Sequence, residues 1–144
     1  MKNLIISACL IGQNCKYNGG NNKLRRLDEL KNKYNLIPIC PEELGGLPTP
    51  RNPSEICGEK VISSVDDDVT DNFIKGAKIA LKTAIENDCK IALLKERSPS
   101  CASNYIYDGN FCGKVIKGMG ITAKLFKENN IKIYSEEQIK DLID

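Results

Sequence analysis

The sequence predicts an α/β fold, namely a single-domain, three-layer Rossmann-like fold with a mostly parallel sheet. Two observations carry this prediction. Short apolar runs alternate with amphipathic stretches through most of the 144 residues, which is typical of a parallel sheet covered by helices on both faces. The length is that of one domain of ordinary size, so we interpret residues 1–144 as a single domain.

Two strands and a helix are predicted in the N-terminal part of the chain. The apolar residues 4–8 predict a strand buried on both faces, which ends at Cys9. After a polar loop, apolar residues recur every three to four positions and predict a helix over residues 24–34. A second strand is predicted at residues 36–39, ending at Cys40. Pro38 within it predicts a place at the edge of the sheet.

Residues 41–60 differ from the rest of the chain in composition. Four of the six prolines and three glycines lie here, which predicts a long loop without regular structure. Loops of this length inside a domain are usually functional, and Cys40 and Glu42 lie where the loop begins. We therefore expect it to contribute to a functional site; a plain surface excursion is the alternative.

The clearest helix is predicted to begin at Thr70. Its hydroxyl suits an N-cap, and Val69 and Ile74 fit a hydrophobic staple. The buried stripe of this helix is expected to consist of Phe73, Ala77, Ala80, Leu81, Ala84 and Ile85.

The C-terminal half continues the alternation of strands and helices. The predicted elements are a strand at 91–94, a hairpin within 105–111, a short strand at 115–116, a helix at 122–129 and a strand at 131–134. Asp108 followed by Gly109 is the hairpin signal, and residues 135–138 form a capping box that opens a terminal helix. The glycine motif at residues 118–123 lies too late in the chain for a dinucleotide-binding half, and we interpret it as close backbone packing.

Composition excludes several classes of function. The chain has no histidine, which removes Ser-His-Asp catalysis and histidine-ligated zinc. A formal net charge of +2 is too balanced for a protein that binds mainly phosphates. No apolar run reaches the length of a membrane span. The seven cysteines are too sparse for a disulfide scaffold, so we expect a cytoplasmic protein with reduced thiols.

Three of the cysteines follow predicted strands. Cys9 follows the first strand, Cys40 follows the second, and Cys101 lies in the segment after the strand at 91–94. Right-handed crossovers place the carboxyl ends of parallel strands at one edge of the sheet, where ligands bind. The other cysteines have no such placement, and we interpret them as small buried hydrophobic residues; these are Cys15, Cys57, Cys89 and Cys112.

Three thiolates in a chain without histidine suit a soft metal centre. Iron–sulfur clusters use cysteine thiolates, and three protein ligands leave one coordination position open for a substrate. Carboxylates and hydroxyls are then the candidates for acid–base chemistry. Glu42 lies two positions after Cys40, while Ser98 and Ser100 precede Cys101.

The segments around these residues resemble the thiouracil desulfidase family, and the likeness covers nearly the whole chain. The matching segments are 7–12 (SACLIG), 40–42 (CPE), 46–51 (GLPTPR), 69–70, 76–77, 94–101 (LKERSPSC), 107–109 (YDG), 118–120 (GMG) and 135–136. The combination of CPE, GLPTPR and KERSPSC is specific to this family.

The resemblance implies a function as well as a fold. It implies a [4Fe-4S] cluster held by Cys9, Cys40 and Cys101, a catalytic acidic residue at Glu42 and a catalytic serine at Ser98, and we add Ser100 as a substrate contact. The implied reaction replaces the sulfur of 2-thiouracil, or of a related thiolated base, with oxygen and releases hydrogen sulfide without electron transfer. The substrate would be a small-molecule thiolated nucleobase, because the balanced charge argues against tRNA.

Two other functions fit the same residues. The chain could be a non-catalytic module that stores or senses sulfide or a cluster, with the same three cysteine ligands. It could also be an α/β domain that holds structural zinc through four cysteines. Turnover of 2-thiouracil separates the first alternative from the enzyme, and metal analysis separates the second.

Overall fold

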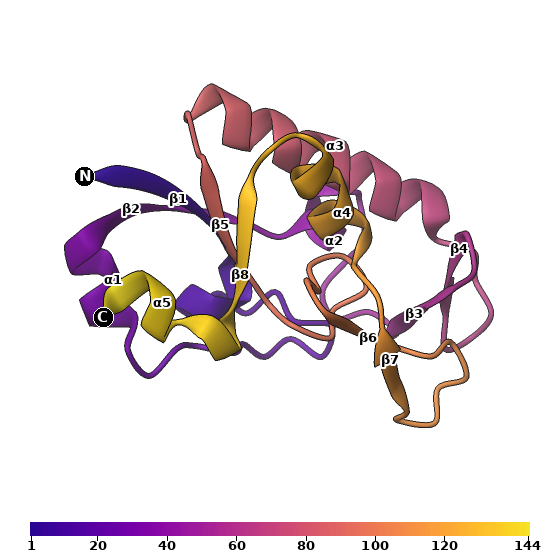
Figure 1. Cartoon of the computed structure of the whole chain (residues 1–144). Helices are drawn as coiled ribbons and strands as arrows, with labels where there is room; N and C mark the ends of the chain where they lie inside the picture. Colours follow the sequence, from indigo (N-terminus) through magenta and orange to yellow (C-terminus); the bar gives the residue numbers. More distant parts are fainter.

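A four-stranded parallel sheet forms the centre of the protein. The computed structural model describes all 144 residues. The sheet contains β1 (Lys2–Ser7), β2 (Tyr34–Ile39), β5 (Ile91–Leu94) and β8 (Lys132–Ser135) in the order β2-β1-β5-β8 (Figure 1). Every pairing is parallel, which confirms the predicted fold class.

The strand register aligns the carboxyl ends of the strands. Ser7 at the end of β1 pairs with Ile39 at the end of β2, and Leu94 at the end of β5 pairs with Ser135 on β8. The predicted edge position of β2 is confirmed, since β2 has a neighbour on one side only. An edge suits Pro38 because proline has no N–H to donate to a second neighbouring strand. The segments that follow β1, β2 and β5 therefore begin side by side.

Helices cover both faces of the sheet, as predicted. One core lies between the sheet and the helices α3 (Thr70–Glu86) and α4 (Ile121–Glu128); the other lies beneath α1 (Leu27–Lys33) and α5 (Lys140–Ile143). Along β1, Ile5 packs into the first core while Leu4 and Ile6 pack into the second. This alternation is what a strand covered on both faces requires.

The helix α3 begins at Thr70 as predicted, but its predicted N-cap is wrong by one residue. Val69 is the N-cap, and the Thr70 hydroxyl instead accepts a hydrogen bond from the Val61 amide at 2.9 Å. The predicted stripe is also too wide, since Ile85 is 63% exposed. The fully buried positions are Phe73, Gly76, Ala77, Ala80 and Ala84. Small residues dominate them because α2 and α4 pack closely against this helix.

The expected structureless loop at 41–60 contains regular structure. It begins with the short helix α2 (Pro41–Leu44) and includes β3 (Ser54–Cys57), which pairs with β4 (Lys60–Ser63). Proline is favoured at the first helical position, because the N–H that it lacks would have no partner within the helix. Hydrogen bonds from the Gly109 and Phe111 amides to the Glu55 carboxylate tie this hairpin to a distant loop, a contact that local sequence does not encode.

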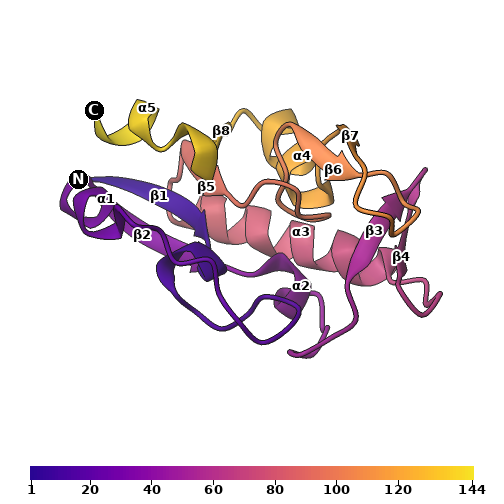
Figure 2. The same ribbon diagram turned by 90° about the horizontal axis from the view of Figure 1, so that it is seen from below.

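A second hairpin joins β6 (Tyr105–Tyr107) to β7 (Val115–Lys117). Residues 108–114 connect the strands, so Asp108 and Gly109 open a longer loop and do not form a tight turn. The two hairpins lie together at the end of the molecule away from both termini (Figures 1 and 2). They extend the protein beyond the carboxyl edge of the sheet.

The C-terminal elements follow the prediction closely. Ser135 forms the expected capping box with Gln138 at the 3-10 helix η2 (Glu136–Gln138), which leads into α5. The longest helix is α3, with 17 residues, and no helix has the length and apolar character of a membrane-spanning segment.

Candidate functional site

A cavity of about 500 Å³ lies where β1, β2 and β5 end. Cys9 reaches it from the 3-10 helix η1 (Ala8–Ile11) after β1, Cys40 from the junction of β2 and α2, and Cys101 from the segment after β5. These are the three cysteines that strand-end placement predicts to lie together. Glu42, Ser98 and Ser100 line the same cavity.

Close backbone packing fixes the segment that carries Cys40 and Glu42. Cys40 is the N-cap of α2, and the backbones of α2 and α3 approach closely at two glycines. A Cβ atom on Gly76 would lie 1.8 Å from the Pro41 carbonyl oxygen, and one on Gly45 would lie 2.0 Å from the Asn72 carbonyl oxygen. Only glycine fits at both places, so α3 sets the position of α2.

Cys101 is held by a hydroxyl on one side and by a glycine on the other. The Ser98 hydroxyl accepts hydrogen bonds from the amides of Ser100 at 3.2 Å and Cys101 at 3.1 Å. Opposite, a Cβ on Gly120 would lie 2.4 Å from the Ser100 carbonyl carbon. The glycine motif at 118–123 therefore serves close backbone packing, as its position in the chain predicted.

An ion pair and two hydroxyls form a chain along the cavity wall. Arg51 Nε donates to Glu42 Oε1 at 2.9 Å, and the Ser100 hydroxyl donates to Glu42 Oε2 at 3.2 Å. The hydroxyl oxygens of Ser100 and Ser98 are 3.0 Å apart. The side chains of Arg51 and Glu42 are only 6% and 15% exposed. Both carboxylate oxygens of Glu42 are thus held in fixed directions next to Cys101.

The cavity thiols differ in acidity. Burial raises the pKa of Cys9, with a hydrogen bond to Asn22 opposing it, and burial raises the pKa of Cys101 to about 12. A hydrogen bond with the Cys15 thiol lowers the pKa of Cys40 to about 7, against the effect of burial. A metal that binds here must therefore displace protons from Cys9 and Cys101, whereas about half of the Cys40 side chains are already thiolates at neutral pH.

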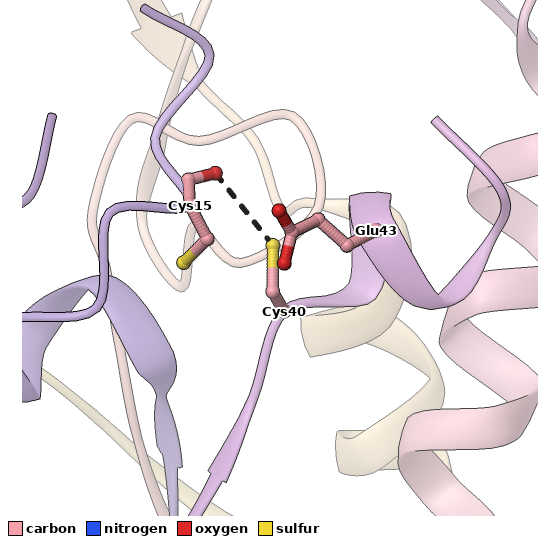
Figure 3. Close-up of side chains that lie close together, drawn as sticks. All are labelled: Cys15, Cys40 and Glu43. Atoms are coloured by element: carbon pink, nitrogen blue, oxygen red, sulfur yellow. Dashed lines mark hydrogen bonds between the residues drawn. The ribbon is translucent and has the colours of Figure 1, made fainter. Parts of the chain in front are cut away.

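Cys15 is a cavity residue that strand-end reasoning missed. It is buried, as expected, but it lines the cavity beside Cys40. The sulfurs of both residues and a carboxylate oxygen of Glu43 all lie within 4.8 Å of one another (Figure 3). Arg51 holds Cys15 there by donating from Nη2 to its carbonyl oxygen at 2.8 Å. Cys15 lies in a polar loop and follows no strand, so no local pattern marks it.

The remaining cysteines do not line the cavity. Their predicted burial is confirmed only in part. Cys89 is buried in the core beneath α3 and α4. Cys57 is half-buried and donates to the Gly109 carbonyl oxygen at 3.4 Å. Cys112 is exposed, because it lies in the long loop that replaces the predicted tight turn.

Three charged residues at the site were given no role by sequence reasoning, although each lies inside a quoted motif. Arg51 orients Glu42. Lys95 lines the cavity and forms an ion pair with Glu136 at 2.8 Å. Glu96 is 2% exposed and accepts hydrogen bonds from the amides of Asn104 and Tyr105, which joins the 95–101 segment to β6. The sequence signal for these residues is a charged side chain inside a motif that is otherwise apolar or turn-forming.

The side chains of the cavity fit an iron–sulfur cluster. Thiols from three separate segments line one wall, sulfur is the donor that such clusters use, and no imidazole competes for the metal because the chain has no histidine. The fold and the site together define the class of this protein: an α/β protein with a soft-metal centre at the carboxyl edge of its sheet.

Comparison with known proteins places the chain within that class. The model of the 2-thiouracil desulfurase family matches residues 4–138, and the chain belongs to this family. It is 37% identical over 150 residues to the uncharacterized protein YbbK of Bacillus subtilis (strain 168), covering 97% of this chain and 99% of that protein. The solved structure of the [4Fe-4S]-dependent thiouracil desulfidase TudS superimposes with a TM-score of 0.94 at 41% identity, over 99% of this chain and 95% of that one. These similarities confirm the expected family and fold.

Proposed function

We propose that this chain is a [4Fe-4S]-dependent thiouracil desulfidase. It converts a thiolated uracil and water into the oxo base and hydrogen sulfide, with no change in oxidation state. The family and the similarity to TudS support this reaction. The observation that carries it is the Arg51–Glu42–Ser100–Ser98 chain, which ends beside Cys101 in the cavity wall.

Cys9, Cys40 and Cys101 are the proposed cluster ligands. When bound, a cluster with three protein ligands supplies a Lewis-acidic iron with an affinity for soft sulfur. Residues 1–144 form the single iron–sulfur desulfidase domain in this proposal. Reduced thiols are needed to hold a cluster, which supports the cytoplasm as the compartment.

Glu42 is the proposed general base. Arg51 and Ser100 each donate a hydrogen bond to one of its oxygens, which fixes the orientation of the carboxylate. Its remaining lone pairs can accept a proton from a water in the cavity. Arg51 forms an ion pair with this carboxylate at 2.9 Å. A carboxylate can perform this step in a chain that has no histidine.

Ser98 is the proposed catalytic serine, and Ser100 is the proposed contact to the substrate. The Ser98 hydroxyl accepts two backbone N–H groups. Because Ser100 donates its only proton to Glu42, Ser98 donates its own proton to the Ser100 oxygen at 3.0 Å, and this is the proton that it can redirect to a bound base ring. Ser100 is 1% exposed and connects this donor to Glu42. Tyr107 and Phe111 line the cavity from the second hairpin. The size of the cavity, about 500 Å³, and the net charge of +2 favour a free thiolated base over tRNA.

Metal analysis tests the ligand assignment, and turnover tests the reaction. Iron and acid-labile sulfide are measured per chain after oxygen-free purification of Cys→Ser variants. Changes at Cys9, Cys40 or Cys101 should remove most of both, while the same change at Cys57, Cys89 or Cys112 should leave them near the unmodified level. Zinc without labile sulfide would instead indicate a structural metal site.

The same protein is then assayed with 2-thiouracil and no electron donor. Uracil and sulfide should appear in equal amounts over many cycles. Tight sulfide binding without turnover would identify a storage or sensing module, which needs the cysteines but not the ordered Arg51–Glu42 pair.

A further inference from the structure

Cys15, Cys40 and Glu43 form a compact set of metal-binding side chains that shares only Cys40 with the proposed cluster ligands. Their two sulfurs and one carboxylate oxygen lie within 4.8 Å of one another (Figure 3). In a tetrahedral zinc site with Zn–S of about 2.3 Å and Zn–O of about 2.1 Å, ligand atoms are roughly 3.5–3.8 Å apart. A shift of about 1 Å at most would complete such a site.

We propose that the cluster-free chain binds one thiophilic divalent cation, such as Zn²⁺, through Cys15, Cys40 and Glu43. The donor set of two thiolates and one carboxylate is one that zinc accepts, and three protein ligands leave the fourth position for water. The site takes a single ion and does not need Cys9 or Cys101.

The backbone around these ligands is already held in place. Cys40 and Glu43 lie three residues apart at the start of α2, so they occupy the same side of the helix. The glycine contacts between α2 and α3 fix that helix. Cys15 is held through its carbonyl oxygen by Arg51 at 2.8 Å. A cation therefore orders few groups when it binds, which favours affinity.

The ion has a route from solvent to the thiols. Glu43 is exposed and its carboxylate accepts a hydrogen bond from the Thr49 hydroxyl, whereas Cys15 is only 4% exposed. The carboxylate is thus the outer ligand of the site and the two thiols are the inner ones.

Because both sites use Cys40, the chain cannot hold the divalent cation and the cluster at the same time. A Cys40 thiolate bound to a divalent cation is occupied and is not free for the cluster. Zinc bound at this site should therefore block cluster assembly. The same cation should not block it when Cys15 is replaced.

Cobalt titration of the full-length, reduced, cluster-free chain tests the site. Co²⁺ serves as the probe because thiolate coordination gives it charge-transfer and d–d absorption bands. The unmodified chain should bind one Co²⁺ with these bands. Cys15→Ser and Glu43→Gln should each weaken binding at least about tenfold, the lower limit of what even an indirect ligand contact costs. Cys9→Ser, Cys101→Ser and the core control Cys89→Ser should bind as the unmodified chain does.

Three results would overturn the proposal. The first is absence of the cobalt bands in the unmodified chain. The second is unchanged binding by Glu43→Gln, whose exposed position makes misfolding an insufficient explanation. The third is a loss in Cys9→Ser or Cys101→Ser as large as in Cys15→Ser, which would place the ion among the cluster cysteines. Because neither substrate nor cluster is present, these results are independent of the desulfidase proposal.

A competition experiment tests the shared ligand. Chain loaded with one equivalent of Zn²⁺ should take up at least about tenfold less iron during cluster reconstitution than zinc-free chain, while Cys15→Ser should take up similar iron with and without Zn²⁺. Equal iron uptake by zinc-loaded and zinc-free unmodified chain would contradict the shared use of Cys40.

Discussion

Arg51 Nε lies 2.9 Å from Glu42 Oε1, and the two side chains are 6% and 15% exposed. The pair is held almost out of solvent at the wall of the cavity that contains the cysteines. A buried ion pair is costly to desolvate and is therefore weak support for stability alone. Its position suggests that it is retained because it orients the proposed base.

Replacing Glu42 should separate catalysis from assembly. Glu42→Gln keeps the size of the side chain but removes the base, so kcat for 2-thiouracil should fall by about 10²–10⁴-fold while iron and sulfide per chain stay unchanged. Ser98→Ala should lower kcat by roughly 10²–10³-fold with the cluster retained. Normal turnover in iron-loaded Glu42→Gln would exclude the proposed base.

Replacing Arg51 should affect both stability and rate. Arg51→Ala leaves the Glu42 carboxylate buried without its partner, which should lower the free energy of unfolding by about 3–5 kcal/mol. Arg51→Lys keeps the charge but loses the fork of donors to Glu42, Thr49 and the Cys15 carbonyl. It should therefore recover much of the stability but little of kcat.

The matched control for Arg51 is Arg26, which pairs with Asp144 at the surface. Arg26→Ala should shift the denaturation midpoint much less than Arg51→Ala, because exposed pairs are screened by solvent. Full activity in Arg51→Lys would indicate that the charge alone is needed and that the orientation of Glu42 is not.

Adding a methyl group at Gly120 should displace the backbone that carries Cys101. In Gly120→Ala the new Cβ meets the backbone of Ser100 and Cys101, with the nearest atom at 2.4 Å, and one of these segments must move. In the control Gly118→Ala the nearest atoms belong to the flexible Ile106 side chain. Iron content and kcat should fall in the first variant and change little in the second; equal effects would mean that this contact does not position Cys101.

Alkylation of the cluster-free chain tests the different acidities of the thiols. The pKa of Cys40 is lowered to about 7, so its thiolate fraction and its rate of reaction with iodoacetamide should reach half of their maximum near pH 7 and level off about one pH unit higher. Burial raises the pKa of Cys101 to about 12, so it should react far more slowly across the same range. Mass spectrometry of the modified peptides measures both rates. Faster reaction of Cys101 at pH 7 would contradict this order.

Much of the fold and of the three-cysteine set could be predicted from the sequence because both depend on local patterns. The apolar runs at β1 and β5 and the capping box at Ser135 are encoded within a few residues. The rule that parallel strands end at one edge then places Cys9, Cys40 and Cys101 together.

The features that were missed depend on contacts between distant segments. The Cys15 carbonyl oxygen accepts hydrogen bonds from Arg51 and from the Cys40 thiol, and the β3–β4 hairpin is held by bonds from a distant loop to Glu55. Thr70 does not cap α3 because its hydroxyl has a better-placed donor in the Val61 amide. Neighbouring residues carry no information about such partners.

The most direct test of the proposed hydrolysis is turnover of 2-thiouracil in oxygen-labelled water by anaerobically reconstituted protein with no reductant. The account predicts uracil and sulfide in equal amounts over many cycles, with one labelled oxygen at the former sulfur position. A strict requirement for an electron donor, or uracil without the label, would contradict it even if Cys9, Cys40 and Cys101 were shown to hold the cluster.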